Sequence, residues 1–395
     1  MIRSIIVSLA GLSFCANATV SYQLITNTAN PKQVTIQADT SDIGTFQLSK
    51  PRTTQSPDVP DIQCISNAGQ TSNVSYDTPT SCHQLSWTVT FQAKTSDEFE
   101  PAQQVDTYSP DEGWYFLSEW NSLPTIAGQD IQVCDPDNLC SAMPNSEQPP
   151  LFVVWGMPHE RMNIGSSTVI VKSNALPLLK SNGSWFNNLT HQLDYLTDVF
   201  NNKRPQQWQL IYFSKDKSQR NISGAAGHHI LLSNLLTQKG QLTKDSMFHL
   251  AKVTAHESVH FIGSRSLPVW AEEGLAEYYA IKSLKFTDLN YHSSPIKTWG
   301  KAANGFQHLG NVGLVEAGKK VTLDKDMQYY PLFYVKAPAF WQAVDEQLQA
   351  NRSSLDALVP LLKTGNDFEL PDEFINQVVD IIGHDNWQQI TLAYL

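Results

Sequence analysis

The sequence predicts a multi-domain chain with an N-terminal β-sandwich, a central α+β domain and a C-terminal α-helical domain. Three observations predict this fold class. The 395 residues exceed what one hydrophobic core usually organises. Apolar residues change along the chain from alternation to helical spacing. A proline-rich stretch, SAMPNSEQPP, separates the two patterns. The predicted boundaries are a signal peptide at 1–18, the β domain at 19–147, the α+β domain at 148–290 and the helical domain at 291–395.

The first eighteen residues have the three parts of an export signal. MIRS supplies a basic start, IIVSLAGLSFCA an apolar run, and ANA, ending at Ala18, a small-residue cleavage site. The apolar run is too short for a permanent transmembrane helix, and no later segment is long enough for one. We therefore expect a cleaved signal peptide and a secreted or periplasmic protein, of bacterial origin, with no transmembrane span.

The cysteines fit an oxidising compartment. Cys15 lies in the signal, and four cysteines remain, all before residue 150. Four cysteines allow three connectivities. Among these we expect pairing between neighbours in the sequence, Cys64 with Cys82 and Cys134 with Cys140.

Charge and composition restrict the class of partner. The chain carries 27 basic and 38 acidic side chains, a net charge of −11, without a run of like charges. Nucleic-acid binding needs a basic surface, so we expect no nucleic-acid partner. Hydrophobic residues make up 41% of the chain, enough for well-packed cores.

The elements follow from periodicity. The N-terminal part alternates apolar with polar residues between Pro, Gly, Asn and Asp clusters, which predicts strands at 20–26, 32–38, 83–93 and 113–117. The middle part predicts strands at 151–157, 167–173, 207–214 and 228–236, with helices at 184–202, 244–263 and 268–284. Beyond residue 325, helical spacing recurs at 332–351, 354–365 and 371–383.

The stretch HESVH carries the chemistry. His256 and His260 are four residues apart, so they share one face of the predicted helix and can fill two positions of a tetrahedral zinc site. Glu257 lies about 100° round the helix, beside the metal rather than on it. A carboxylate there can take a proton from a zinc-bound water. A mostly apolar helix does not hold these three polar groups without partners.

A third ligand must come from elsewhere, and the next helix offers one. Twelve residues separate His260 from Glu273, and GSRSLP among them provides a turn. Glu272 and Glu273 compete for the role, and the register with Trp270 and Glu277 favours Glu273. Glu277, one turn further along, is placed either to orient a zinc histidine or to form an ordinary surface ion pair.

At this point the sequence resembles a family. HESVH followed by PVWAEEGLAEYY resembles the gluzincin zinc metallopeptidases, in particular the glycyl aminopeptidase and aminopeptidase N families. Their pattern continues with W-x-x-E-G, whose glutamate is the third zinc ligand. The resemblance therefore implies Glu273 as the ligand, one Zn²⁺ per chain and a thermolysin-like catalytic domain. The spacing from His260 is shorter here than in aminopeptidase N relatives, so the connecting loop must differ.

The resemblance implies further site residues. The families carry Y-x-K-G, whose tyrosine stabilises the oxyanion, and YVKA here places Tyr334 on it, with Lys336 retained and Ala337 in place of glycine. Tyr329 and Tyr330 are nearby alternatives. Upstream, GAAGHH matches a segment that lines the substrate cleft, which assigns Gly224, Gly227 and His228 to the cleft.

The cleft segment also bears on specificity. Gly227 replaces a glutamate that in the relatives binds the substrate's free amine. We therefore expect N-terminally blocked peptides to be cleaved at least as well as free ones, with the peptide added as a strand along HHILLS. Glu272 or an acidic side chain of the C-terminal domain is the alternative source of the missing charge.

The resulting hypothesis is an exported zinc metallopeptidase acting on peptides or proteins, with His256, His260 and Glu273 as ligands and Glu257 as base. Whether it is an aminopeptidase or an endopeptidase stays open. Two alternatives remain: a binding or adhesion protein with a vestigial or structural zinc site, and a zinc hydrolase of a non-peptide amide or ester.

Overall fold

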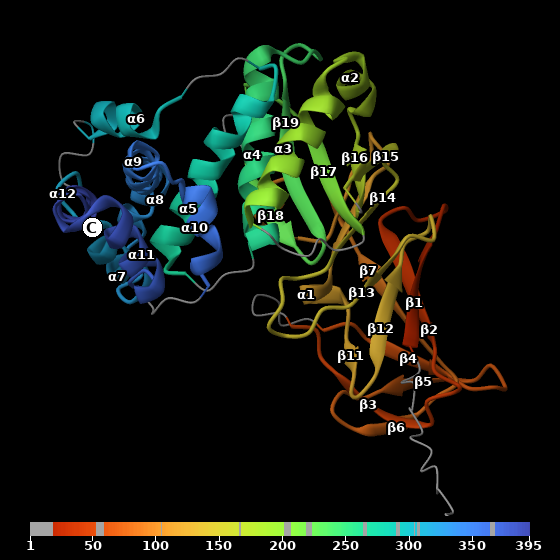
Figure 1. The fold of residues 1–395 in the computed structure, drawn as a ribbon. Helices are drawn as coiled ribbons and strands as arrows, with labels where there is room; N and C mark the ends of the chain where they lie inside the picture. The colour runs from red at the N-terminus through yellow and green to blue at the C-terminus, as the bar shows by residue number, and fades with distance from the viewer. Residues whose placement is uncertain are drawn as a thin grey trace, which may run out of the picture. The chain divides into compact units, whose positions relative to one another are not determined.

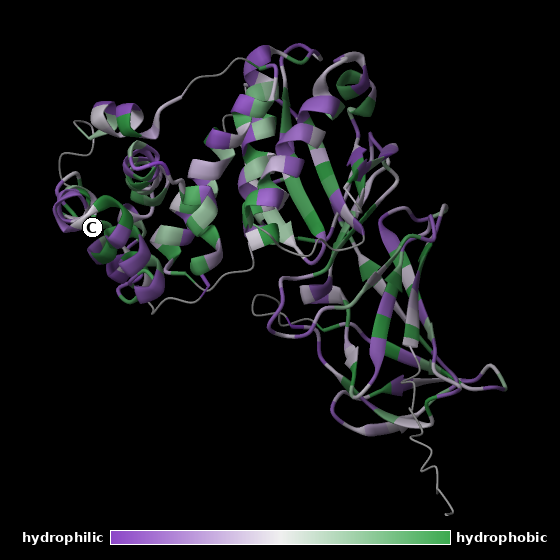
Figure 2. Cartoon of the chain, viewed as in Figure 1, coloured by the Kyte–Doolittle hydropathy of each residue, from purple (hydrophilic) through white to green (hydrophobic). Residues whose placement is uncertain are grey.

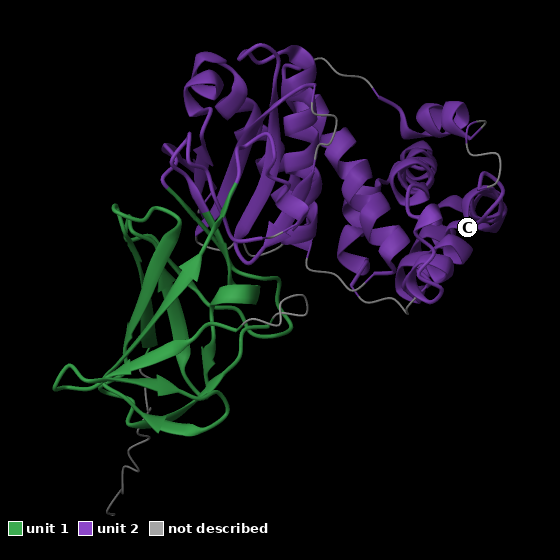
Figure 3. Cartoon of the chain, turned by 180° about the vertical axis from the view of Figure 1, so that it is seen from behind, with its two compact units in different colours: residues 1–93, 116–155 green, residues 94–115, 156–395 purple. Residues whose placement is uncertain are grey.

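The computed structural model describes residues 19–52, 59–103, 105–165, 167–200, 207–218, 223–263, 267–289, 293–303, 305, 309–363 and 368–395. The predicted signal peptide lies outside the described residues. The chain divides into two compact units (Figure 3). Unit 1 comprises Met1–Ala93 and Phe116–Trp155, and unit 2 comprises Lys94–Tyr115 and Gly156–Leu395. The predicted boundaries at residues 147 and 290 stay predictions.

Unit 1 is rich in β-structure, as predicted. One sheet has seven strands in the order β13-β12-β1-β2-β7-β4-β5, and a second has three in the order β11-β3-β6. The described residues of unit 1 also include a short helix, α1 Glu119–Ser122. The strands of unit 1 are β1 Thr19–Thr26, β2 Gln33–Asp39, β3 Thr45–Ser49, β4 Ile62–Ile65, β5 Thr71–Val74, β6 Pro79–Ser81, β7 Gln84–Thr90, β8 Gln92–Ala93, β10 Tyr115–Ser118 (whose first residue is counted in unit 2), β11 Thr125–Ile126, β12 Asp130–Cys134, β13 Cys140–Ala142 and β14 Phe152–Trp155.

Side chains alternate between a buried and an exposed face along these strands. In β1, Val20, Tyr22 and Leu24 are buried between more exposed neighbours, as expected for a sheet with one face on a core. Both predicted disulfides, Cys64–Cys82 and Cys134–Cys140, are present.

Unit 2 contains a five-stranded sheet in the order β15-β16-β17-β19-β18. The strands β16, β17 and β19 are parallel, whereas β15 and β18 run antiparallel to their neighbours. Apolar residues dominate β17 and β19, which are buried on both faces (Figure 2). The bounds in this part are η1 Pro101–Gln103, β9 Thr107–Tyr108, β15 His159–Ile164, β16 Ser167–Ser173, α2 Leu176–Ser181, α3 Trp185–Phe200, β17 Gln207–Asp216, β18 Gly224–Gly227, β19 Ile230–Thr237, α4 Lys244–Gly263 and α5 Val269–Ser283.

Helices α3 and α4 lie against this sheet (Figure 1). The helix predicted at 184–202 is confirmed as α3, and its apolar face, which includes Trp185, Leu189 and Leu193, is buried in the shared core. Helix α4 begins where Thr243 accepts a hydrogen bond from the Ser246 amide at 3.1 Å, which satisfies a first-turn N–H group.

The rest of unit 2 is helical, as predicted. The elements are η2 Leu284–Phe286, α6 Pro295–Ala302, α7 Leu314–Thr322, η3 Met327–Tyr329, α8 Leu332–Val335, α9 Ala337–Ala350, α10 Leu355–Leu358, η4 Val359–Leu361, α11 Asp372–Ile382 and α12 His384–Tyr394. Helix α5 packs between α4 on one side and α8 and α9 on the other. None of the described helices is both long enough and apolar enough to cross a bilayer.

Candidate metal centre and pocket

Two imidazoles face each other across one turn of α4. The Nε2 atoms of His256 and His260 are 3.1 Å apart, as the i, i+4 spacing predicts. His256 is buried and His260 is partly buried. At this separation both ring nitrogens can coordinate one metal ion placed between them.

Glu273 of α5 completes a set of three ligand atoms. Its Oε2 lies 3.3 Å from His256 Nε2 and 3.6 Å from His260 Nε2. Tetrahedral zinc, with ligands at about 2.0–2.1 Å, separates ligand atoms by about 3.3 Å. The triangle of two nitrogens and one carboxylate oxygen therefore fits zinc in both size and donor type. Glu273 rather than Glu272 reaches this point, and Glu272 lies instead near the other ring nitrogen of His260.

Carboxylates of α5 also approach the far nitrogens of both rings. Glu277 Oε2 lies 3.3 Å from His256 Nδ1, although the pair is not aligned as a hydrogen bond, and Glu277 forms an ion pair with Lys252. Glu272 Oε1 lies 3.6 Å from His260 Nδ1. Glu277 is buried rather than solvated, and its ion pair with Lys252 is the salt bridge that the alternative interpretation allows. Its role in orienting His256 stays a prediction.

The side chains of the pocket favour positive charge. Burial opposes the charged form of His260, but contacts with Glu272 and Glu273 outweigh it and raise its pKa to about 10. Burial likewise opposes the charged form of Glu273, but hydrogen bonds and charges from His256 and His260 hold the pKa of that carboxyl well below its usual range. The pocket thus favours positive charge, which either a proton on a histidine or a bound cation would supply.

Glu257 lines the same pocket without joining the three ligand atoms. It packs against Gly224 of β18, where an added Cβ would lie only 2.6 Å from Glu257 Oε1. Glycine at 224 therefore leaves the space that the carboxylate occupies. Burial raises the pKa of Glu257, partly offset by the charges of His256 and His260. A raised pKa suits a group that accepts and later releases a proton.

Two tyrosines, Tyr330 and Tyr334, line the pocket and contact Glu273. The Tyr334 hydroxyl, from α8, donates to Glu273 Oε2 at 2.8 Å, and the Tyr330 hydroxyl donates to Glu273 Oε1 at 3.3 Å. The two hydroxyls are 3.3 Å apart. Burial and the charge of Glu273 raise the pKa of Tyr334, so its hydroxyl remains a donor at neutral pH. Tyr329 is not among the residues that line this pocket of about 410 Å³.

Of the three predicted cleft residues, the structure places Gly224 in the pocket lining, whereas Gly227 and His228 are not among its lining residues. Their assignment to the substrate cleft stays a prediction. The expectation that a peptide pairs along HHILLS is wrong, because β19 already pairs with β17 on one edge and β18 on the other. The edge strand of the described sheet on this side is β18.

Helix α5 is fixed by packing that the motifs alone do not reveal. The Trp270 indole donates to the Phe368 carbonyl at 3.0 Å, and the Trp341 indole donates to the Ala271 carbonyl at 3.1 Å. A methyl group on Gly274 would collide with Ala337. These three contacts thus fix the position of α5 and of the carboxylates that it carries.

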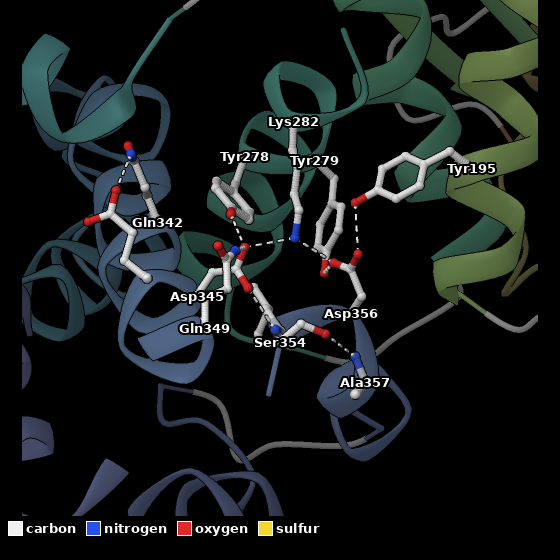
Figure 4. Close-up of polar contacts among 12 residues, drawn as sticks. Tyr195, Tyr278, Tyr279, Lys282, Gln342, Asp345, Gln349, Ser354, Asp356 and Ala357 are labelled. Carbon is white, nitrogen blue, oxygen red and sulfur yellow. Dashed lines mark hydrogen bonds and ion pairs between the residues drawn. The ribbon is translucent and has the colours of Figure 1, made fainter. Parts of the chain in front are cut away.

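A buried polar network holds the other end of α5 (Figure 4). Lys282 lies between Asp345 and Asp356, at 2.7 and 2.6 Å. Tyr278 donates to Asp345 at 2.5 Å and Tyr279 to Asp356 at 2.8 Å. The network joins α5 to α9 and α10. It was not predicted, because the α5 residues and their aspartate partners lie more than sixty positions apart in the sequence.

Comparison with known proteins addresses the fold. No protein-family model and no curated protein matches the sequence. Among solved structures, a crystal structure of an aminopeptidase N family protein from Idiomarina loihiensis matches with a TM-score of 0.62 and 11% sequence identity. The match covers 95% of this chain and 76% of that protein. At this identity the match shows only that the chain is similar in fold to an aminopeptidase N family protein.

Proposed function

We propose that this chain is an exported zinc metallopeptidase with a thermolysin-like catalytic domain. The observation that carries the proposal is the convergence of His256 Nε2, His260 Nε2 and Glu273 Oε2 within 4.8 Å of one another, in a pocket that Glu257 also lines. Zinc held there would lower the pKa of a water molecule and polarise the carbonyl of the bond to be cleaved. The two disulfides support export to an oxidising compartment.

Glu257 would move the proton. Its carboxylate lies beside the three ligand atoms rather than among them, so it stays free to accept the proton of the attacking water. It would then donate the proton to the leaving amine as the peptide bond breaks. A purely structural metal site has no use for such a carboxylate, which argues against the adhesion alternative.

Tyr334 would stabilise the negative charge that develops on the carbonyl oxygen. Its hydroxyl donates to the proposed ligand oxygen Glu273 Oε2. A small rotation of the side chain would let it donate instead to an oxyanion in the pocket. Tyr330, 3.3 Å from it, can take over the hydrogen bond to Glu273. The similarity in fold to an aminopeptidase N family protein supports peptide bonds as the substrate class.

A substrate panel tests the proposal. The purified chain is incubated with unstructured peptides, with simple esters and with non-peptide amides, and products are identified by mass. The samples are repeated after chelation and after zinc is restored. We expect peptide hydrolysis that chelation abolishes and zinc restores. Zinc-dependent cleavage of only the esters or non-peptide amides would instead support the alternative hydrolase.

A further inference from the structure

Lys252 lies one helical turn before the first histidine of the ligand triangle. It and His256 are four residues apart on α4, so both side chains lie on one face of that helix. Glu277 of α5 reaches both of them. Its Oε1 atom forms an ion pair with Lys252 Nζ, and its Oε2 atom lies 3.3 Å from His256 Nδ1. One carboxylate thus bridges a lysine and a proposed metal ligand.

The bridging carboxylate is buried, whereas the lysine reaches it from the surface. The side chain of Glu277 is 7% exposed and that of Lys252 is 28% exposed. A carboxylate buried to this degree needs a partner of opposite charge, because burial removes the water that would otherwise solvate it. Lys252 supplies that charge. Without it, the Glu277 side chain would gain free energy by turning toward water and away from the ring of His256.

His256 in turn needs a partner at Nδ1. This nitrogen is buried, and among the described residues it has no aligned hydrogen bond. A histidine that binds a metal through Nε2 carries its proton on Nδ1, and an acceptor for that proton fixes both the tautomer and the orientation of the ring. Glu277 Oε2 is placed to be this acceptor. The position of the Glu277 carboxylate therefore governs how His256 presents Nε2 to the ligand triangle.

We propose that Lys252 is a positioning residue of the metal site, which holds the Glu277 carboxylate beside His256 Nδ1 and thereby strengthens zinc binding without contacting the ligand triangle. The inference rests on the zinc site of the proposed function and on the predicted role of Glu277. It adds a residue that neither the helical spacing nor the family motifs single out.

A lysine near a zinc site has two opposing effects. Its positive charge repels the metal ion directly, and its hold on Glu277 favours the metal ion. The repulsion is small here, because the charge of Lys252 is already paired with that of Glu277 and the side chain is partly exposed to screening solvent. Partners that orient a metal-binding histidine typically contribute about 10- to 100-fold in metal affinity. The positioning effect should therefore exceed the repulsion.

A double-mutant cycle separates the two effects. Zinc affinity is measured by competition with a chromophoric chelator for the wild type, Lys252→Met, Glu277→Ala and the variant that carries both changes. Methionine and alanine favour helices, so α4 and α5 should be retained. Lys252→Arg keeps the charge, and Lys244→Met is the matched control, since Lys244 is an exposed lysine of the same helix. Chemical denaturation of each metal-free protein measures its stability, and Lys252→Gln replaces Lys252→Met in the cycle should the latter not fold.

We expect Lys252→Met to weaken zinc binding by about tenfold or more. In the Glu277→Ala background the same change should cause no further loss, because Lys252 acts through Glu277. Lys252→Arg and Lys244→Met should stay within a few-fold of the wild type. In NMR spectra of the zinc-loaded proteins, the Nδ1 proton of His256 should exchange with water faster in Lys252→Met than in the wild type.

Three results would overturn the inference. Unchanged zinc affinity in Lys252→Met would show that the lysine does not position the site. An equal loss with and without Glu277 would show that Lys252 acts by another route, and an equal loss in Lys244→Met would show that the effect is not specific. All three leave the zinc peptidase proposal intact. A wild type that binds no zinc would overturn the proposed function and this inference with it.

Discussion

Glu257 and Glu273 are both glutamates of one pocket, yet their surroundings assign them different chemistry. Glu273 is held by two histidines and two tyrosines, whereas Glu257 lies partly buried in the same pocket without joining the ligand triangle. The helical period predicted the places of His256 and Glu257. The register along the second helix favoured Glu273 over Glu272, and the packed structure shows that an oxygen of Glu273 lies with the two ring nitrogens.

Glu257→Gln should therefore remove the base and spare the metal. We expect turnover to fall by a factor of about a hundred or more, the usual worth of general-base catalysis, with KM little changed. The measurement is steady-state hydrolysis of the best peptide from the panel, with Glu316→Gln as control, since Glu316 is an exposed carboxylate on α7 outside the pocket. Turnover within a few-fold of the wild type would remove Glu257 from the mechanism.

Tyr334→Phe should lower turnover more than it raises KM, because the oxyanion exists only in the transition state. Loss of one such donor typically costs about 3 kcal/mol. Tyr330→Phe should have a smaller effect, since Tyr330 makes the longer contact with Glu273, and Tyr329→Phe serves as the control outside the pocket. A larger loss from Tyr330→Phe would exchange the two roles.

At the scale of elements, periodicity predicted α4 and α5 well, since the predicted helices at 244–263 and 268–284 correspond to Lys244–Gly263 and Val269–Ser283. It did not predict how α5 is held. The close approach of Gly274 to Ala337 and the ion pairs of Lys282 with Asp345 and Asp356 join positions that no local pattern connects. Such contacts depend on the path of the chain, which spacing alone does not specify.

Asp345→Asn should destabilise the helical part of unit 2. Asp345 is buried and accepts hydrogen bonds from Tyr278, Lys282 and the Leu355 amide. Removing one partner of a buried ion pair typically costs about 3 kcal/mol or more. Chemical denaturation at neutral pH measures the effect, with Glu346→Gln on the exposed side of α9 as control. Equal stability of the two variants would show that the network contributes little.

The same residue gives a pH dependence. Burial raises the pKa of Asp345, but hydrogen bonds from Leu355, Lys282 and Tyr278 outweigh it and lower the pKa below its usual value. Its contribution to stability is therefore complete above the unfolded pKa of about 3.9 and is lost as the pH falls through the lower folded pKa. The stability difference between wild type and Asp345→Asn should shrink in that acidic range. A difference that grows on acidification would contradict this sign.

At the scale of the whole molecule, the residues of the site belong to unit 2, while both disulfides belong to unit 1. The sequence predicted a β-rich start and a helical end. It did not predict that Lys94–Tyr115 leaves the first unit and joins the second, because that segment carries no composition shift. Glu100 of this segment binds Lys215 and Ser223 in the later part of unit 2. These contacts join distant positions of the sequence and are visible only in the folded chain.

Removing the metal should therefore affect the units differently. A chelator should abolish activity and increase amide exchange in α4 and α5, whose facing side chains lose their shared ion. Exchange in β1, β2 and β7 of unit 1 should not change, because these strands contain none of the three ligand residues, and both disulfides of the chain lie in their unit. Hydrogen–deuterium exchange with and without chelator measures both. Loss of protection throughout unit 1 would contradict independent folding of the two units.

Zinc analysis of three proteins tests the central claim most directly. The wild type, Glu257→Gln and Glu273→Gln are purified without chelator, incubated with zinc, freed of excess metal and analysed for zinc per chain. The account predicts one zinc per chain in the wild type and in Glu257→Gln, and a clear loss in Glu273→Gln, because only Glu273 contributes an oxygen to the ligand triangle. A wild type without zinc, or equal loss of zinc in both variants, would contradict it.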